Sequence, residues 1–304
     1  FIDIWYLTNT EAGWITGSFY LAYVLAVPIL VALTDRIDPK RIYLIGVGSI
    51  ALAGLGYAWL ADGFWSALVF RMLWGIGWAG SYMPGLKALS DLIEGPQQSR
   101  AVAAHAASVG VSSAASFLIA GMVAETFGWR WGIALGGAGA VVAGLLMGGF
   151  FPARTPKPQQ SRTVNLLDFR PVFRNRSAMA YSIGYGVHTF EMSAFRNWVV
   201  AFLTFAAAYN GVKDIVEWLS PTVVATAMGL LGVWASVFGN EIARRIGRCR
   251  WILIIMWSGI AISAGVGYAP AVSYTIVVCF VLLYGAVIWA DSVSLTAGTT
   301  GSAV

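Results

Sequence analysis

The chain has 304 residues, of which 58% are hydrophobic and only 11% are charged. Soluble proteins carry about 25% charged residues and cannot bury so much apolar surface in one core. This composition excludes a soluble globular protein and indicates helices that use lipid as their solvent. The net charge of +5 comes mostly from basic residues in loops between apolar segments, so we expect no nucleic-acid partner.

A helix that crosses a bilayer needs ~20 largely apolar residues. Nine segments meet this requirement, so we predict an all-α membrane protein. The stretch 152–177, rich in Pro, Gln and Arg, separates the first five spans from the last four and predicts a linker with an interfacial helix around Leu166–Phe173. The predicted spans are 14–33, 43–61, 65–90, 101–124, 131–151, 178–207, 221–240, 251–268 and 271–291.

Lys and Arg are unequally distributed between the two alternating sets of loops. One set, which includes the linker, holds fourteen of them, and the opposite set holds only Arg130 and Lys213. Basic loops stay on the cytoplasmic side. We therefore place the linker in the cytoplasm and residue 1 outside, in a cytoplasmic (plasma or inner) membrane.

An internal repeat relates the first spans to the last. The loop Asp35–Arg41 (DRIDPKR) corresponds to Arg244–Arg250 (RRIGRCR), so spans one to three match spans seven to nine. Completing the repeat predicts two bundles of six helices, with one span missing at the front and two at the back; the alternative is a nine-span protein with an incomplete repeat. We expect an N-terminal bundle at 1–151 and a C-terminal bundle at 178–304.

Four motifs at matching positions resemble the major facilitator superfamily. LTDRIDPKR (Leu33–Arg41) resembles the family's signature loop between its second and third helices, and ARRIGRCR (Ala243–Arg250) repeats it. RMLWGIGWAG (Arg71–Gly80) resembles the fourth-helix pattern, and FGWRW (Phe127–Trp131) resembles the join of the fifth and sixth helices. The resemblance implies a secondary transporter with two pseudo-symmetric bundles that alternate access to a site at the membrane midplane.

The match with the family also has departures. Gly110–Gly121 lacks the Gly-Pro motif of the family's antiporters, which argues against drug-type proton antiport. The resemblance implies a gating role for Asp35 and Arg36. The second loop lacks the family's Asp, and Glu241 and Arg245, spaced i,i+4, could replace it.

Arg71 lies about two turns inside the third predicted span. Burying a guanidinium in hydrocarbon costs roughly 2.5 kcal/mol or more, so the side chain should face protein or a water-filled cavity. Helical spacing places Trp78 and Tyr82 on the same stripe. This pattern predicts an anion-binding or proton-coupling site lined by aromatic residues; the alternative is a structural Arg bonded to helix-end carbonyls.

His188 and Glu191 lie near the middle of span 178–207. An ionisable residue inside a membrane is a functional-site hypothesis by default, and such a pair could take up and release a proton during transport. The alternative is a polar pair that satisfies its own hydrogen bonds. The same helix face carries Tyr181, Tyr185 and Phe195.

We therefore predict a secondary transporter in which Arg71, His188 and Glu191 face the central site. Basic residues inside the membrane favour a small organic anion as the solute, moved together with a proton, whereas the aromatic residues equally suit an exporter of apolar compounds. A membrane-embedded enzyme and a non-transporting membrane sensor are the alternatives from other classes. The predicted cavity walls are Tyr20, Tyr23, Trp78, Tyr82, Tyr181, Tyr185 and Phe195.

The sequence offers no constellation for catalysis. Its two His residues, far apart, give no metal-ligand spacing, and there is no phosphate-binding Gly-Lys-Ser/Thr loop. We expect no metal, no cofactor and no enzymatic activity. The expected partners of a monomeric protein are the lipid bilayer, a small-molecule substrate and the coupling proton.

Overall fold

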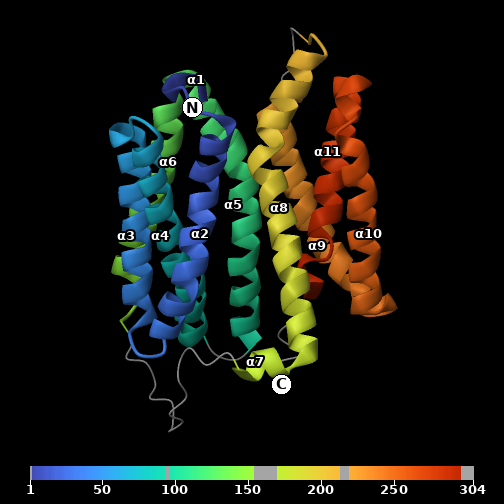
Figure 1. The fold of residues 1–304 in the computed structure, drawn as a ribbon. Coiled ribbons are helices and arrows are strands. Elements are labelled where there is room, and N and C mark those ends of the chain that lie inside the picture. Colours follow the sequence, from blue (N-terminus) through green and yellow to red (C-terminus); the bar gives the residue numbers. More distant parts are fainter. Residues whose placement is uncertain (1, 94–95, 154–169, 213–218, 296–304) are drawn as a thin grey trace. The chain divides into compact units, whose positions relative to one another are not determined.

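The computed structural model describes residues 2–93, 96–153, 170–212 and 219–295. This part of the chain contains nine long helices, which Figure 1 draws as coiled ribbons. The long helices are α2 (Asn9–Leu33), α3 (Pro39–Leu60), α4 (Phe64–Leu92), α5 (Pro96–Phe127), α6 (Trp129–Phe150), α8 (Arg176–Tyr209), α9 (Pro221–Ile246), α10 (Arg248–Val266) and α11 (Tyr274–Trp289). The short elements are α1 (Ile2–Trp5), α7 (Arg170–Arg174) and the 3-10 helix η2 (Ala269–Ala271).

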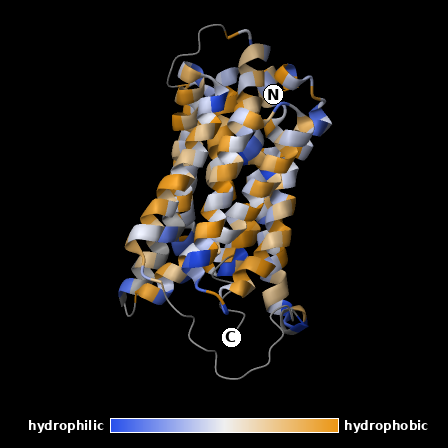
Figure 2. Cartoon of the chain, turned by 90° about the vertical axis from the view of Figure 1, so that its left-hand side faces the viewer, coloured by the Kyte–Doolittle hydropathy of each residue, from blue (hydrophilic) through white to orange (hydrophobic). Residues whose placement is uncertain are grey.

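Each predicted span coincides with one long helix, which confirms the all-α membrane fold. Seven helical segments of the described chain are long and apolar enough to cross a membrane on length and composition alone. The two long helices outside that group are α4 and α8, which carry Arg71, His188 and Glu191. Figure 2 shows hydrophobic residues along the helices on the side that faces the viewer, with the most hydrophilic residues mainly towards the helix ends.

Local polar contacts set the helix starts. Thr8 and Glu11 form a capping box, in which the Glu11 N–H donates to the Thr8 hydroxyl at 3.2 Å and the Thr8 N–H donates to the Glu11 carboxylate at 2.8 Å. Helix α2 therefore begins at Asn9, before residue 14, where the predicted span begins. Asp38 caps α3 in a similar way, accepting a 2.9 Å hydrogen bond from the Lys40 N–H.

Two glycines turn the chain sharply between helices. Gly128, with φ 91°, separates α5 from α6, and Gly247, with φ 97°, separates α9 from α10. Side chains with a Cβ rarely adopt this left-handed backbone conformation, whereas Gly adopts it freely. The left-handed backbone at these two turns therefore explains why the FGWRW and RRIGRCR motifs each contain a glycine.

The chain divides into two compact units. The first comprises Phe1–Ala106 and Ile119–Asp168, and the second comprises Ala107–Leu118 and Phe169–Val304, so the middle of α5 groups with the second unit. Helix α7 falls within the predicted interfacial helix around Leu166–Phe173. The first residues of that helix, and most of the predicted linker, lie outside the described residues.

The first unit is held together by close approaches between helix backbones. Helix α3 packs against α4 and α6, and α4 also packs against α2. A Cβ on Gly46 would lie 2.6 Å from the carbonyl carbon of Gly80, and a Cβ on Gly75 would overlap the carbonyl oxygen of Phe19. Small residues at such crossings are the usual way in which helices associate in lipid. The contact at Gly75 fixes α4 against α2 one turn beyond Arg71.

The core of the second unit lies between α8, α9, α11 and η2. The side chains of Leu203, Met228 and Val281, one from each long helix, are almost fully buried there. Met228 packs against Gly285, where any Cβ would overlap its side chain. Helices α8 and α11 are therefore neighbours, and their polar residues can meet.

Candidate functional site

Arg71 lies half-buried on α4, with its guanidinium among aromatic side chains of the first unit. Its Cζ atom is 5.0 Å from the centroid of the Phe19 ring and 6.0 Å from that of Trp74, which is the range of a cation–π interaction. Tyr20 and Tyr57 are close enough to act on the guanidinium electrostatically. Within the described part of the chain, no ion pair joins Arg71 to an acidic side chain.

The predicted aromatic residues of α4 form a stack. The Trp78 and Tyr82 rings are parallel within 1° at 6.1 Å, and His105 of α5 stacks on Tyr82 at 5.1 Å. The other side of Trp78 packs against the core cluster that includes Val47. His105 thus extends the row of rings.

The predicted walls on α2 lie beside the same region. Tyr20 meets the Phe19 ring edge-on at 5.1 Å, and the backbone nitrogen of Tyr23 would be 3.2 Å from a Cβ on Gly75. Both Tyr side chains are half-buried. Arg71 and its aromatic neighbours therefore come from adjoining stretches of α2, α3 and α4.

His188 is buried in the second unit beside an acidic residue of the turn that follows α11. Its Nδ1 atom lies 2.9 Å from Oδ1 of Asp291, and the two side chains are 3% and 2% exposed. The Nε2 atom of His188 is buried without a hydrogen-bond partner among the described residues.

Glu191, three residues later on α8, also meets α11. The Tyr284 hydroxyl donates a 2.6 Å hydrogen bond to its Oε1 atom, and Oε1 would lie 3.3 Å from a Cβ on Gly259 of α10. Glu191 thus has a partner on α11, and His188 has one in the turn that follows α11. The sequence had suggested that the two act as a pair with each other.

The remaining predicted residues of the α8 face have separate surroundings. Tyr181 contacts Cys249 of α10, with 3.4 Å between the hydroxyl oxygen and the sulfur. The Tyr185 ring lies 6.0 Å from His188 and is 41% exposed, whereas Phe195 meets the Tyr284 ring edge-on at 4.7 Å. Phe195 is thus packed beside the Glu191 contact, and Tyr185 is open on one side.

Sequence reasoning missed Asp291 and Tyr284. Asp291 is the acidic residue at the end of the predicted span 271–291, and an ionisable residue within a span was the available signal. No pattern pointed to Tyr284, because its role comes from the packing of α11 on α8. Each of these contacts joins residues of the same unit.

The predicted gating loop, between α2 and α3, takes part in polar contacts within the first unit. The Lys87 ammonium lies 3.9 Å from Asp35 and 3.6 Å from Asp91, and these three side chains are between 37% and 46% exposed. Arg36 is exposed. Exposed ion pairs contribute only about 0–1 kcal/mol, so they can break and reform easily.

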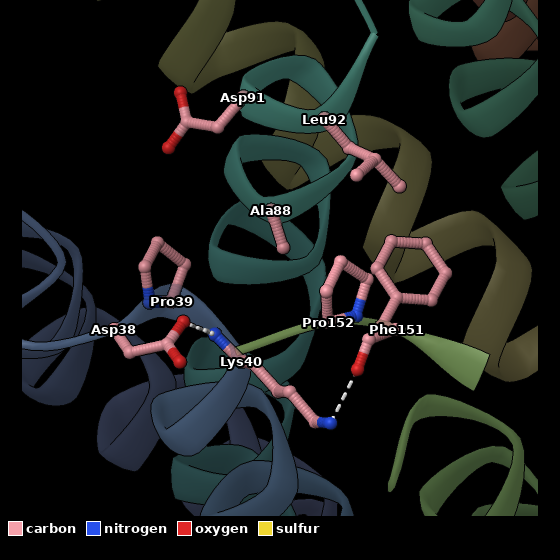
Figure 3. Close-up of a pocket in the computed structure, with 8 residues that line it drawn as sticks. All are labelled: Asp38, Pro39, Lys40, Ala88, Asp91, Leu92, Phe151 and Pro152. Carbon is pink, nitrogen blue, oxygen red and sulfur yellow. Dashed lines mark hydrogen bonds between the residues drawn. The ribbon is translucent and has the colours of Figure 1, made fainter. Parts of the chain in front are cut away.

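The side chain of Lys40, a basic residue of this loop, is held by hydrogen bonds to the backbone. Its ammonium donates to the carbonyl oxygens of Gly148, at 3.0 Å, and of Phe151, at the end of α6. Figure 3 shows Lys40 reaching across a small cleft towards Phe151, while its backbone N–H donates to Asp38. A cation at this place satisfies carbonyls that a helix end leaves without partners.

In the second unit, Glu241 binds two basic residues of its own helix. Its carboxylate lies 3.4 Å from Arg244 and 3.3 Å from Arg245, at the exposed end of α9. The pairing expected from the i,i+4 spacing of Glu241 and Arg245 is therefore present.

The family model described as Major Facilitator Superfamily matches residues 3–303. The chain is 25% identical over 256 residues to protein spinster homolog 1 of Homo sapiens, covering 78% of this chain and 48% of that protein. It is also 25% identical over 211 residues to probable sphingolipid transporter spinster homolog 2 of Arabidopsis thaliana, covering 63% of this chain and 43% of that protein. The chain thus spans about half the length of the curated relatives it matches.

A solved structure has the same fold. It is the inward-facing, unoccupied form of a bacterial homolog to the human lysosomal transporter Spinster, with a TM-score of 0.71 and 15% identity. The match covers 98% of this chain and 69% of that one. Family model, relatives and fold agree, and the chain belongs to the Major Facilitator Superfamily.

Proposed function

We propose that the whole protein is a secondary transporter, and not an enzyme, that moves a small organic anion together with a proton across a cytoplasmic membrane. Family membership supports transport by alternating access, in which two helical bundles rock about a site near the midplane. In this proposal the protein works as a monomer, with the linker 152–177 in the cytoplasm and Asp35 and Arg36 as part of the gate.

The observation that carries the anion proposal is the state of Arg71. A guanidinium on a membrane-spanning helix is expensive to keep, and a neighbouring carboxylate would normally compensate for it. The guanidinium of Arg71 lies instead beside the aromatic rings of Phe19 and Trp74. A carboxylate or phosphate of the substrate would supply the missing negative charge, and the planar guanidinium can bind it through two parallel hydrogen bonds.

The proton part of the proposal depends on α8. His188 and Glu191 are the ionisable residues in the middle of that helix, and both meet α11 rather than lipid. A proton that binds there when the site faces one side, and leaves when it faces the other, would couple the gradient to solute movement. Tyr181, Tyr185 and Phe195 would then line the substrate path from the same helix, with Tyr20, Tyr23, Trp78 and Tyr82 from the first unit.

A second candidate substrate is an amphiphile with an acidic head and an apolar tail. The Arabidopsis relative is named as a probable sphingolipid transporter, and the aromatic rings around Arg71 would accommodate apolar groups beside a bound acid. Arg71 would bind the acidic group of either substrate, and the two candidates differ only in the size of the apolar part of the substrate.

The test uses pairs of compounds that differ in charge but share a carbon skeleton. We would measure binding of benzoate against benzamide, and of decanoate against decanamide, to the purified full-length protein by calorimetry. Hydrogen bonds to a charged group contribute about 1.5–3 kcal/mol, so Arg71→Gln should weaken acid binding roughly 10- to 100-fold and leave amide binding unchanged.

Arg71→Lys is the matched variant, because it retains the charge but not the forked geometry, and it should fall between wild type and Arg71→Gln. Preference for decanoate over benzoate would favour the amphiphile. Equal binding of acids and amides, or acid binding that survives Arg71→Gln, would rule out the anion proposal.

A further inference from the structure

We infer that Asp291 and His188 together form a proton-binding site of the transporter, separate from Glu191. The inference rests on the proposed proton coupling for its role in transport, but not for its chemistry. Nothing in the sequence pattern assigned Asp291 a function. The site is made by α11 bringing a carboxylate against the imidazole of α8.

Because the pair is buried, the number of protons that it holds determines how much net charge lies inside the protein. With a neutral imidazole beside an ionised carboxylate, the pair carries one buried negative charge. When His188 takes up a proton, the pair becomes neutral overall, with opposite charges 2.9 Å apart. Side chains that are 3% and 2% exposed receive almost no help from solvent, so a charge on one of them acts mainly on the other.

The surroundings of the pair support binding and release. Among the described residues, Nε2 of His188 and Oδ1 of Asp291 are buried without a hydrogen-bond partner, and so are the hydroxyls of Thr189 on α8 and of Ser294 beyond the end of α11. Buried polar atoms are nearly always satisfied in native proteins. The unsatisfied atoms of the pair itself are therefore the place where we expect a proton to bind and to leave.

The backbone of α11 changes course at the same place. The helix ends at Trp289, Ala290 and Asp291 form a turn, and Ser292–Leu295 are helical again. The Ala290 carbonyl accepts a 2.9 Å hydrogen bond from the Trp251 indole of α10. The carboxylate therefore sits at a two-residue turn between helical segments.

Other titratable groups near α8 do not take over this role. Glu191 is occupied by Tyr284 of α11, and Tyr181 contacts Cys249 of α10. Tyr185 lies beside His188 on α8 itself. The charged residues of α7 and α9, the helices that also pack on α8, are exposed to solvent: Arg170, Arg174, Glu241, Arg244 and Arg245. Asp291 is thus the ionisable group in direct contact with the His188 imidazole.

The experiment exploits the low His content of this chain, which has only His105 and His188. The full-length protein would be labelled with ¹⁵N-histidine, with His105→Gln used to assign the His188 signals, and titrated in lipid nanodiscs between about pH 5 and 9. Asp291→Asn should lower the midpoint of the His188 titration by about one pH unit or more, a tenfold loss of proton affinity. Asp291→Glu should restore most of that loss.

Tyr284→Phe is the matched control, because it removes a polar contact between the same two helices and should leave the His188 midpoint unchanged. An identical midpoint in wild type and Asp291→Asn, or a His188 that does not titrate in this range, would overturn the inference. If Asp291→Asn does not fold, the wild-type titration and Asp291→Glu still decide it. The readout needs no substrate, so failure of the anion proposal would leave this result intact, and the reverse also holds.

Discussion

The hydroxyl of Tyr284 donates a 2.6 Å hydrogen bond to the carboxylate of Glu191, and this contact joins α11 to α8 midway along both helices. The Phe195 ring packs edge-on against Tyr284 on the same side. The Tyr284 hydroxyl therefore holds a carboxylate of a spanning helix, and the Phe195 ring packs against the Tyr284 ring. That arrangement separates two properties of Glu191, its charge and its hydrogen bond, which different substitutions can remove.

Glu191→Gln removes the charge but retains an oxygen that accepts the Tyr284 hydrogen bond. If Glu191 takes part in proton coupling, this variant should lose accumulation driven by a pH gradient and retain exchange of solute between the two sides. The measurement is uptake into proteoliposomes of the acid that binds best to wild type. Tyr284→Phe is the control: it keeps the carboxylate, so accumulation should persist, with a stability loss of roughly 1.5–3 kcal/mol if the bonded group is ionised. Gradient-driven accumulation by Glu191→Gln would contradict the role of Glu191.

Lys40→Met should destabilise the first unit. The substitution leaves the carbonyls of Gly148 and Phe151 without their donor, which costs about 1–3 kcal/mol when such groups are shielded from water. Arg41→Met removes the same charge from the neighbouring exposed residue and should change stability by less than about 0.5 kcal/mol. Thermal unfolding in detergent compares the two, and equal melting temperatures would show that Lys40 acts only as a loop charge.

Gly46→Ala should disrupt the packing of α3 on α4. The added Cβ would lie 2.6 Å from the carbonyl carbon of Gly80, and neither backbone can move aside without separating the helices. Overpacking of this kind costs typically about 1–3 kcal/mol. At Gly48, two residues along the same helix, an added Cβ would meet no atom within 4 Å, so Gly48→Ala should be neutral or slightly stabilising. Yield of folded protein and its melting temperature would separate the two variants, and similar values would contradict the close crossing.

The sequence allowed the helices to be predicted more completely than the site. Lipid demands long apolar segments, so the nine spans followed from composition, although the Thr8–Glu11 capping box extended α2 beyond its apolar part. Arg71, His188 and Glu191 stood out because ionisable residues are rare in such segments. Their partners did not, since Asp291 and Tyr284 lie roughly a hundred residues further along the chain and meet α8 only through packing. The acceptors of the Lys40 ammonium, Gly148 and Phe151, are also more than a hundred residues away along the chain, so the sequence did not indicate them.

The two glycine joints have a consequence for how the chain enters the membrane. Gly128 and Gly247 leave a single residue between consecutive long helices. Because a single residue joins the two helices, one helix cannot lie in the bilayer while the other remains in water. During synthesis α5 with α6, and α9 with α10, are therefore expected to insert as pairs, and a side chain that strains either joint would impair insertion before any folded bundle exists.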